Sequence, residues 1–204
     1  MSRPGKIVCV GRNYAAHARE LGNAVPERPL LFLKPPSAVI GPGDPIILPS
    51  ASNQVEHEAE IGLVIGRRVR RAGQDEARTA IAALVPANDV TARDLQKTDG
   101  QWTRAKGFDT FCPLGTPVPI PPDLDLTTLE VTGTVNGTPR QHGRTRDMAF
   151  SMPMLVAYIS EIMTLEPGDV ILTGTPEGVG PLVAGDEVTI SIPGYGSLTN
   201  PVRA

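Results

Sequence analysis

The stretch Glu58-Ala-Glu-Ile-Gly-Leu-Val-Ile65 combines an acidic start with an apolar continuation. From Ile61 onward its residues are those that strands favour, which predicts a buried β-strand. Successive side chains of a strand point to opposite faces of a sheet, so Glu58 and Glu60 project to one side and Ala59 to the other. The strand therefore directs two carboxylates at one point, where a core strand would carry apolar groups.

Two carboxylates held this close repel each other unless a proton or a cation neutralises them. Asp89, at the end of another apolar run, can supply a third oxygen. Three carboxylates without clustered thiols or imidazoles suit Mg²⁺ or Mn²⁺, one ion per subunit, better than zinc. The spacing alone leaves open a second interpretation, in which Glu58 and Glu60 are exposed charges of an edge strand and Asp89 begins a helix.

The surrounding sequence predicts a mixed α/β fold that is rich in strands. The 21 glycines and 21 prolines are spread throughout the chain, so it turns often and long helices are few. Asn136-Gly137 predicts a type I′ hairpin turn between two strands. We expect three helices, at 14–22 with Asn13 as its cap, at 75–84 and at 151–163. Strands are expected at 7–10, 30–33, 45–48, 58–65, 129–135, 138 onward and 170–172, and the last strand at 187–192.

Length and composition narrow the class of protein. With 204 residues the chain is expected to form a single domain, 1–204, with a full hydrophobic core. No apolar run approaches the length of a membrane span. The run Ile7 to Val10 is too short for a secretory signal, which predicts a cytoplasmic protein. A net charge of -3 and a single basic cluster, Arg67 to Arg71, argue against a nucleic-acid partner.

Three further residues are candidates for chemistry. His17 and Glu20 lie three positions apart on the first predicted helix, where the carboxylate can polarise the imidazole into a base. Lys106 can stabilise an oxyanion or a carboxylate. The alternative for each is a solvated surface charge. His57, between two glutamates, is interpreted as a loop neighbour and not as a metal ligand.

Several stretches, taken in order, resemble the fumarylacetoacetate hydrolase family, specifically its short acylpyruvase and oxaloacetate decarboxylase-like members. The resemblance runs from about Lys6 to Val202. Its stretches are Gly11-Arg-Asn-Tyr-Ala-Ala-His-Ala-Arg-Glu20, Leu31-Phe-Leu-Lys-Pro35, Glu58-Ala-Glu60, Asn88-Asp-Val-Thr-Ala-Arg-Asp-Leu-Gln96, Ala105-Lys-Gly-Phe108 and Leu172-Thr-Gly-Thr-Pro176.

The resemblance implies a fold, an assembly and a set of roles. The fold would be a β-roll of curved sheets with few short helices, assembled as a homodimer. A small 2-oxo acid would be the substrate, and no nucleic acid or membrane would be a partner. The implied roles are metal ligation for Glu58, Glu60 and Asp89, a catalytic dyad on a mobile lid helix for His17 and Glu20, contact with substrate oxygens for Lys106, and substrate binding for Gln96, Thr175, Arg12 and Arg93.

The implied activity is the metal-dependent hydrolysis of a carbon–carbon bond in an acylpyruvate, such as acetylpyruvate or fumarylpyruvate, with release of pyruvate. Decarboxylation of oxaloacetate is an alternative, because it needs the same electron sink but no attacking water. Isomerisation of 2-hydroxyhepta-2,4-diene-1,7-dioate or hydration of 2-oxo-4-pentenoate is another. A metal-containing binding module without activity is the non-enzymatic alternative.

Overall fold

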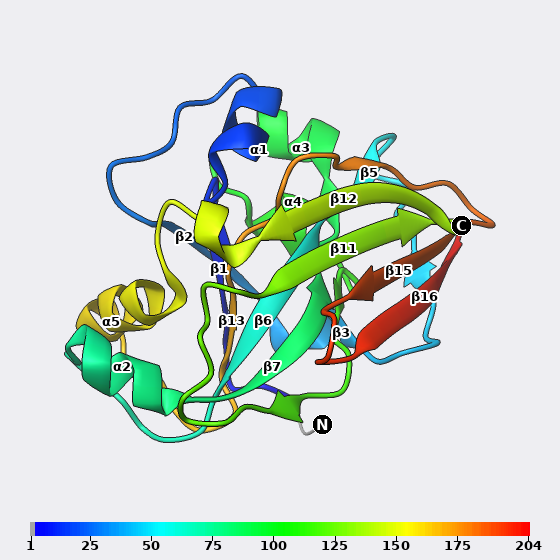
Figure 1. Ribbon diagram of the computed structural model, residues 1–204. Coiled ribbons are helices and arrows are strands. Elements are labelled where there is room, and N and C mark those ends of the chain that lie inside the picture. The colour runs from blue at the N-terminus through cyan, green and yellow to red at the C-terminus, as the bar shows by residue number, and fades with distance from the viewer. Residues whose placement is uncertain (1–2) are drawn as a thin grey trace.

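The computed structural model describes residues 3–204 and shows a mixed α/β fold in which strands predominate (Figure 1). Its central sheet has six strands in the order β10-β7-β6-β13-β1-β2. Most neighbours in it are antiparallel, and β1 and β13 are parallel. The strands are β1 (Ile7–Gly11), β2 (Leu30–Lys34), β6 (Ala59–Ile65), β7 (Ile81–Asn88), β10 (Val118–Pro119) and β13 (Val170–Leu172).

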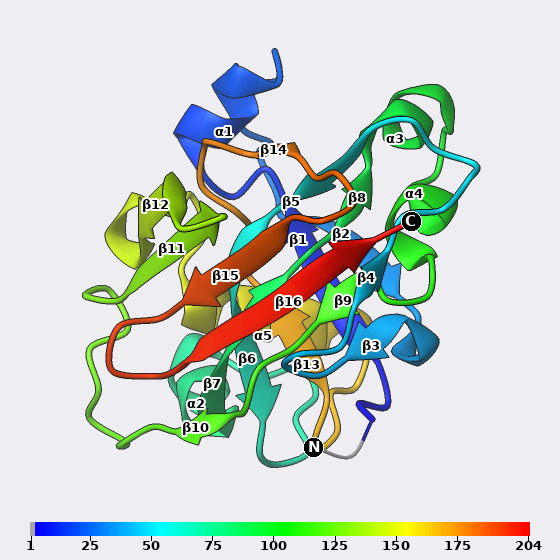
Figure 2. The same ribbon diagram turned by 90° about the vertical axis from the view of Figure 1, so that its right-hand side faces the viewer.

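A second sheet of five strands has the order β12-β11-β15-β16-β4, and β15 and β16 run side by side across Figure 2. Its strands are β4 (Ile46–Ile47), β11 (Glu130–Val135), β12 (Thr138–Arg144), β15 (Glu187–Ser191) and β16 (Ser197–Arg203). Two small sheets complete the fold: β14 (Gly180–Pro181), β5 (Val55–His57) and β8 (Thr91–Ala92) in one, and β3 (Val39–Ile40) with β9 (Cys112–Pro113) in the other.

Both faces of the central sheet are covered by apolar side chains. On one face, Ile61 of β6 belongs to a large core that also contains Val131 and Ile190 of the five-stranded sheet. On the other face, Val85 and Leu172 belong to a smaller core. A strand enclosed on both faces must be apolar along its length. Glu58, directly before β6, and Glu60, within it, therefore mark the place where this packing gives way to a polar site.

The helices are short and lie around the sheets. Figure 1 shows α2 and α5 side by side at one end of the molecule and α1 and α3 at the other. The α-helices are α1 (Ala15–Glu20), α2 (Gln74–Ala80), α3 (Arg93–Thr98), α4 (Thr103–Gly107) and α5 (Met152–Ile162), with 3₁₀ turns at Pro36–Ala38 and Thr145–Asp147. Among residues 3–204, no helix is long and apolar enough to cross a membrane.

Three expectations from the sequence are wrong in detail. The helix expected at 75–84 ends at Ala80, and the apolar residues after it form β7. The strand at 187–191 is followed by another, β16, so it is not the last. Asn13 does not cap α1: its amide donates to the carbonyls of Phe150 and Thr173 and accepts the Phe150 N–H, joining three segments in the interior.

Candidate metal centre and active site

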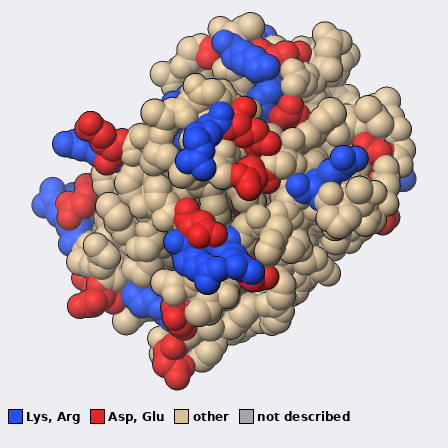
Figure 3. Space-filling view, turned by 45° about the horizontal axis from the view of Figure 1, so that its top comes forward, with Lys and Arg blue, Asp and Glu red and all other residues tan. Residues whose placement is uncertain are grey.

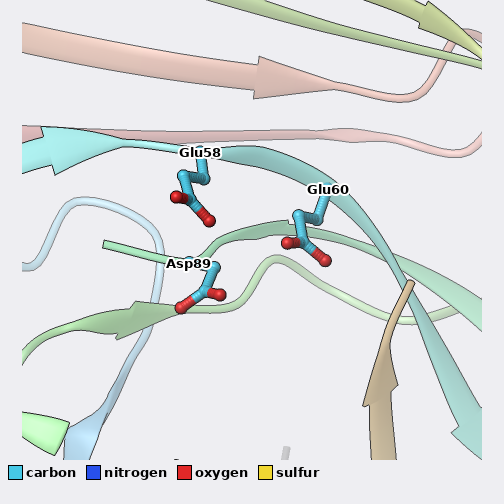
Figure 4. A group of neighbouring side chains, drawn as sticks. All are labelled: Glu58, Glu60 and Asp89. Atoms are coloured by element: carbon cyan, nitrogen blue, oxygen red, sulfur yellow. The ribbon is translucent and has the colours of Figure 1, made fainter. Parts of the chain in front are cut away.

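The three predicted metal ligands meet at one end of the β6–β7 pair. Glu58 precedes β6, Glu60 lies within it, and Asp89 follows β7, whose Asn88 is paired with Ala59. The Asp89 N–H donates to the Glu58 carbonyl at 2.9 Å, which places the third carboxylate opposite the other two. Figure 4 shows the three carboxylates converging on one space. One oxygen of each lies within 4.8 Å of the others, and all three residues are buried.

Buried cations contact two of these three carboxylates. Lys106 donates to Glu58 at 2.9 Å and to Asp89 at 2.7 Å. Arg93 contacts the other oxygen of Glu58 at 2.5 Å and also binds Glu56 at 2.7 Å. These contacts place Lys106 and Arg93, both predicted site residues, directly against the acidic cluster.

A third buried cation, for which no role was predicted, is Lys34 at the end of β2. Its ammonium group lies 2.5 Å from Asp89 and also donates to the carbonyl of Val90 at 3.0 Å. Lys34 lies in one of the stretches on which the family resemblance rests, and that stretch is the signal that could have found it. The strand pattern alone could not have identified Lys34. Lys34 ends β2 and Asp89 follows β7, and these two strands lie far apart in the order of the sheet.

Glu60 is the carboxylate of the cluster that, within residues 3–204, has no cationic partner. Its Oε2 accepts the Gly174 N–H at 2.7 Å. Burial, together with the charges of Asp89 and Glu58, raises its pKa well above the ordinary value. At Glu58, burial also opposes ionisation, but Lys106 and Arg93 outweigh it and hold the pKa below its usual range. Glu60 is therefore the carboxyl group of the cluster whose ionised form lacks compensation, so it tends to hold a proton unless a cation is bound.

The charge balance of the cluster fits a divalent metal ion. Four buried carboxylates, those of Glu56, Glu58, Glu60 and Asp89, face three buried cations, which leaves one negative charge in excess. An added divalent cation changes this excess to one positive charge, which one carboxylate of a ligand neutralises. All donors are carboxylate oxygens, the ligands that Mg²⁺ and Mn²⁺ prefer. The residues present thus suit a hard cation that also binds an organic acid.

The predicted dyad is formed on helix α1. His17 is 4% exposed, and its Nδ1 lies 3.1 Å from Oε2 of Glu20. A carboxylate can only accept, so Nδ1 donates, and in the neutral imidazole Nε2 keeps a free lone pair. Oε1 of Glu20 accepts the Gly178 N–H at 2.9 Å. One carboxylate thereby orients the imidazole and ties α1 to the loop after β13.

One cavity of about 330 Å³ brings the predicted site residues together. His17 and the acidic cluster line it, whereas Glu20, an exposed residue hydrogen-bonded to His17, does not. The other predicted residues at its wall are Arg12, Arg93, Gln96, Lys106 and Thr175. Figure 3, which views the molecule from the side of α1 and α3, shows cationic and acidic side chains interspersed among the described residues on this face.

Gln141 is a buried residue near the site that the sequence did not single out. Its Oε1 accepts the Ala59 N–H at 2.9 Å and a hydrogen bond from His57 Nδ1 at 3.0 Å. Its amide nitrogen donates to the Thr175 hydroxyl and the Pro176 carbonyl. Gln141 alternates with exposed residues on β12, so nothing in the sequence distinguishes it from an ordinary core-facing polar residue.

His57 was expected to be a loop neighbour, but it is the last residue of β5 and is 1% exposed. Burial lowers its pKa, which favours the neutral imidazole. Its Nδ1 donates to Gln141. The group of residues that could hold a metal consists of Glu58, Glu60 and Asp89.

Comparisons with known proteins place the chain in a family. Residues 6–203 match the family model described as "Fumarylacetoacetate (FAA) hydrolase C-terminal". The mitochondrial oxaloacetate tautomerase FAHD1 of Arabidopsis thaliana is 50% identical over 197 residues, covering 95% of this chain and 88% of the relative.

Two solved structures have nearly the same fold. The 2-hydroxyhepta-2,4-diene-1,7-dioate isomerase of Mycobacterium marinum is 48% identical with a TM-score of 0.89, covering 98% of this chain and 75% of that one. The fumarylpyruvate hydrolase of Pseudomonas aeruginosa, solved in complex with Mn²⁺ and pyruvate, is 30% identical with a TM-score of 0.92, covering 98% and 90%. The family resemblance read from the sequence is confirmed, and this chain belongs to the fumarylacetoacetate hydrolase family.

Proposed function

We propose that this protein is a divalent-metal-dependent enzyme that interconverts the keto and enol forms of a small 2-oxo acid, with oxaloacetate as the substrate. The observation that carries the proposal is the placement of His17, a base held by Glu20, in the same cavity as a carboxylate cluster with one uncompensated charge. The oxaloacetate tautomerase that is 50% identical to this chain supports the choice of reaction and substrate.

Glu58, Glu60 and Asp89 would hold Mg²⁺ or Mn²⁺, which supplies a Lewis acid for the 2-oxo oxygen and the neighbouring carboxylate of the substrate. Arg93 holds the Gln96 side-chain oxygen at 2.6 Å, which leaves the Gln96 amide hydrogens to donate to that carboxylate. The Thr175 hydroxyl already donates to the Ala59 carbonyl at 2.9 Å, so Thr175 would contribute its backbone N–H.

The reaction moves one proton and consumes no water. His17 Nε2 takes the proton from C3, and the electron pair of the C3–H bond becomes the C2–C3 double bond. The π pair of the C2–O bond moves onto the 2-oxo oxygen, and the proton that His17 took from C3 passes to this oxygen, which completes the enol and restores the neutral imidazole. Lys106 lines the cavity, and its ammonium group, which donates to Glu58 and Asp89, has a third hydrogen that can bond to this oxygen as negative charge develops on it.

Hydrolysis of an acylpyruvate is the second candidate function. Here His17 would take its proton from a water molecule that attacks the distal carbonyl, and pyruvate would be released. The likeness to the fumarylpyruvate hydrolase with Mn²⁺ and pyruvate favours it. The likeness to the diene-dioate isomerase instead favours proton transfer without water, as in the first candidate. Decarboxylation of oxaloacetate needs no base at all.

The test compares the metal-loaded protein, the chelator-treated protein and the metal-loaded His17→Ala variant. The absorbance of enol-oxaloacetate reports tautomerisation, and released pyruvate reports hydrolysis of acetylpyruvate and fumarylpyruvate or decarboxylation of oxaloacetate. We expect metal-dependent loss of the enol that His17→Ala abolishes. Pyruvate from the acylpyruvates without tautomerisation would replace the first candidate with the second. Decarboxylation that survives His17→Ala would make the protein a decarboxylase, and metal binding without any turnover would make it a binding module.

A further inference from the structure

Two cations at the wall of the cavity have no acidic partner among residues 3–204. Arg12 and Lys97 both line the cavity that contains the acidic cluster, and neither forms an ion pair in the described part of the chain. The cations nearer the cluster, Lys34, Arg93 and Lys106, are each bound to carboxylates. The cavity therefore has an acidic end, whose cations are all paired with carboxylates, and two further cations, Arg12 and Lys97, that form no ion pair among residues 3–204.

Arg12 is held in place although its charge is unpaired. It directly follows β1 and has a φ of 59°, a left-handed conformation that costs a residue with a Cβ roughly 1 kcal/mol or more. Its guanidinium carbon lies 6.0 Å from the centre of the Trp102 ring, which packs edge-on against Phe32 with 5.3 Å between ring centres. A cation over an aromatic face is attracted to it and loses conformational freedom. Lys97, in contrast, is exposed.

We propose that Arg12 binds the second carboxylate of a dicarboxylic 2-oxo acid and so makes the cavity selective for dicarboxylates over monocarboxylates of equal length. The inference rests on the proposed function, which places the first carboxylate at the acidic cluster. A cavity of about 330 Å³ suits a small acid of this kind. The planar guanidinium of Arg12 matches the two oxygens of a carboxylate, and Lys97 adds positive charge nearby.

The charge balance supports the same conclusion. The carboxylate cluster with a divalent cation is neutralised by one carboxylate of the substrate, as derived above. A second substrate carboxylate placed there would be in excess, whereas beside Arg12 it compensates an unpaired positive charge. A methyl group in its place would leave the Arg12 charge without a partner.

The test measures binding of two four-carbon acids by titration calorimetry on the Mg²⁺-loaded protein. Oxaloacetate carries the second carboxylate, and 2-oxobutanoate has a methyl group in that position. We expect the wild type to bind oxaloacetate at least about tenfold more tightly. Arg12→Gln should weaken oxaloacetate binding on the order of 10-fold to 100-fold, the loss typical of a hydrogen-bonded charge pair, and leave 2-oxobutanoate within about twofold. Arg12→Lys, which keeps the charge without the planar group, should lose less.

Arg19→Gln is the matched control, because it removes the same charge from an exposed position of α1 outside the cavity. It should keep the wild-type preference, and retained binding of 2-oxobutanoate shows that the Arg12 variants are folded. Equal affinities of the wild type for both acids, or an unchanged preference in Arg12→Gln, would overturn the role of Arg12 and leave the proposed function standing. Failure of the Mg²⁺-loaded wild type to bind either acid would overturn both.

Discussion

Glu20 and Gly178 lie 158 residues apart in the sequence, and a hydrogen bond of 2.9 Å from the Gly178 N–H to Glu20 Oε1 joins them. Because Oε2 of the same carboxylate accepts from His17, the position of α1 and the orientation of the imidazole depend on one side chain. Glu20 therefore has two separable roles, one electrostatic and one structural.

Substitution of the dyad should separate these roles. His17→Ala removes the base and should lower kcat by about 10²–10⁴-fold, the range for loss of a general base, while Mn²⁺ affinity stays unchanged. Glu20→Gln keeps an oxygen that accepts the Gly178 N–H but loses the charge that fixes the imidazole tautomer. We expect a smaller fall in kcat for Glu20→Gln than for His17→Ala, measured by steady-state kinetics with saturating metal. Equal falls would show that Glu20 acts through charge alone.

Glu60→Gln should abolish stabilisation by metal. Mn²⁺ at about 100 times its Kd stabilises a protein that binds it by about 2.7 kcal/mol, which corresponds to a rise in Tm of roughly 5–10 °C for a chain of this size. Without metal, Glu60→Gln should be at least as stable as the wild type, since it removes a buried carboxylate that lacks a cationic partner. Thermal unfolding with Mn²⁺ and with chelator measures both effects.

Glu56→Gln is the control for this experiment. Glu56 is also buried, but Arg93 and Gln54 bind it, and it lies outside the group of three carboxylates that could hold a metal ion. This variant should keep the rise in Tm with Mn²⁺. A Glu60→Gln variant stabilised by Mn²⁺ as much as the wild type would remove Glu60 from the ligand set.

Gly178→Ala should destabilise the loop that holds α1. An added Cβ would lie 2.1 Å from the carbonyl oxygen of Arg140, and the φ of +93° is itself unfavourable for alanine. The two effects together should cost about 2–5 kcal/mol of unfolding free energy. Gly185→Ala is the matched control, because its φ is +97° and no atom lies within 4 Å of the added Cβ.

Gly185→Ala should lower the free energy of unfolding by only about 1–2 kcal/mol, which is the cost of the backbone conformation alone. Urea denaturation measures both variants. The clash with Arg140 would be excluded as a cause if the two substitutions had equal effects.

The two cysteines should be inert in the folded protein. Burial is the main cause that raises the pKa of Cys112 to about 12 and the pKa of Cys9 well above its ordinary value. A thiol reacts as its thiolate, so at pH 8 neither should react with a disulfide reagent such as DTNB until the chain unfolds. Titration in buffer should detect almost no thiol, and titration in guanidinium should detect two. A thiol that reacts quickly in buffer would contradict the enclosed packing beneath β1.

The structure could be predicted from the sequence wherever local geometry determines it. The alternation of Glu58 and Glu60 is a property of any strand, and Asn136-Gly137 forms the expected turn, with φ values of 52° and 74°. Local pattern failed at Ile81 to Leu84, where a short apolar run suits a helix and a strand equally well. The position of Lys34 beside Asp89 depends on the order of strands in the sheet, which no local pattern contains.

The order of the central sheet also affects how the protein can form during synthesis. β6, which carries Glu60, pairs with β7 on one side and with β13 on the other. β7 leaves the ribosome soon after β6, whereas β13 and Gly174, whose N–H binds Glu60, follow more than a hundred residues later. When β7 and Asp89 have left the ribosome, the nascent chain contains all three carboxylates but lacks the strand and the loop that enclose Glu60. The enclosed carboxylate site can be completed only in the last part of translation.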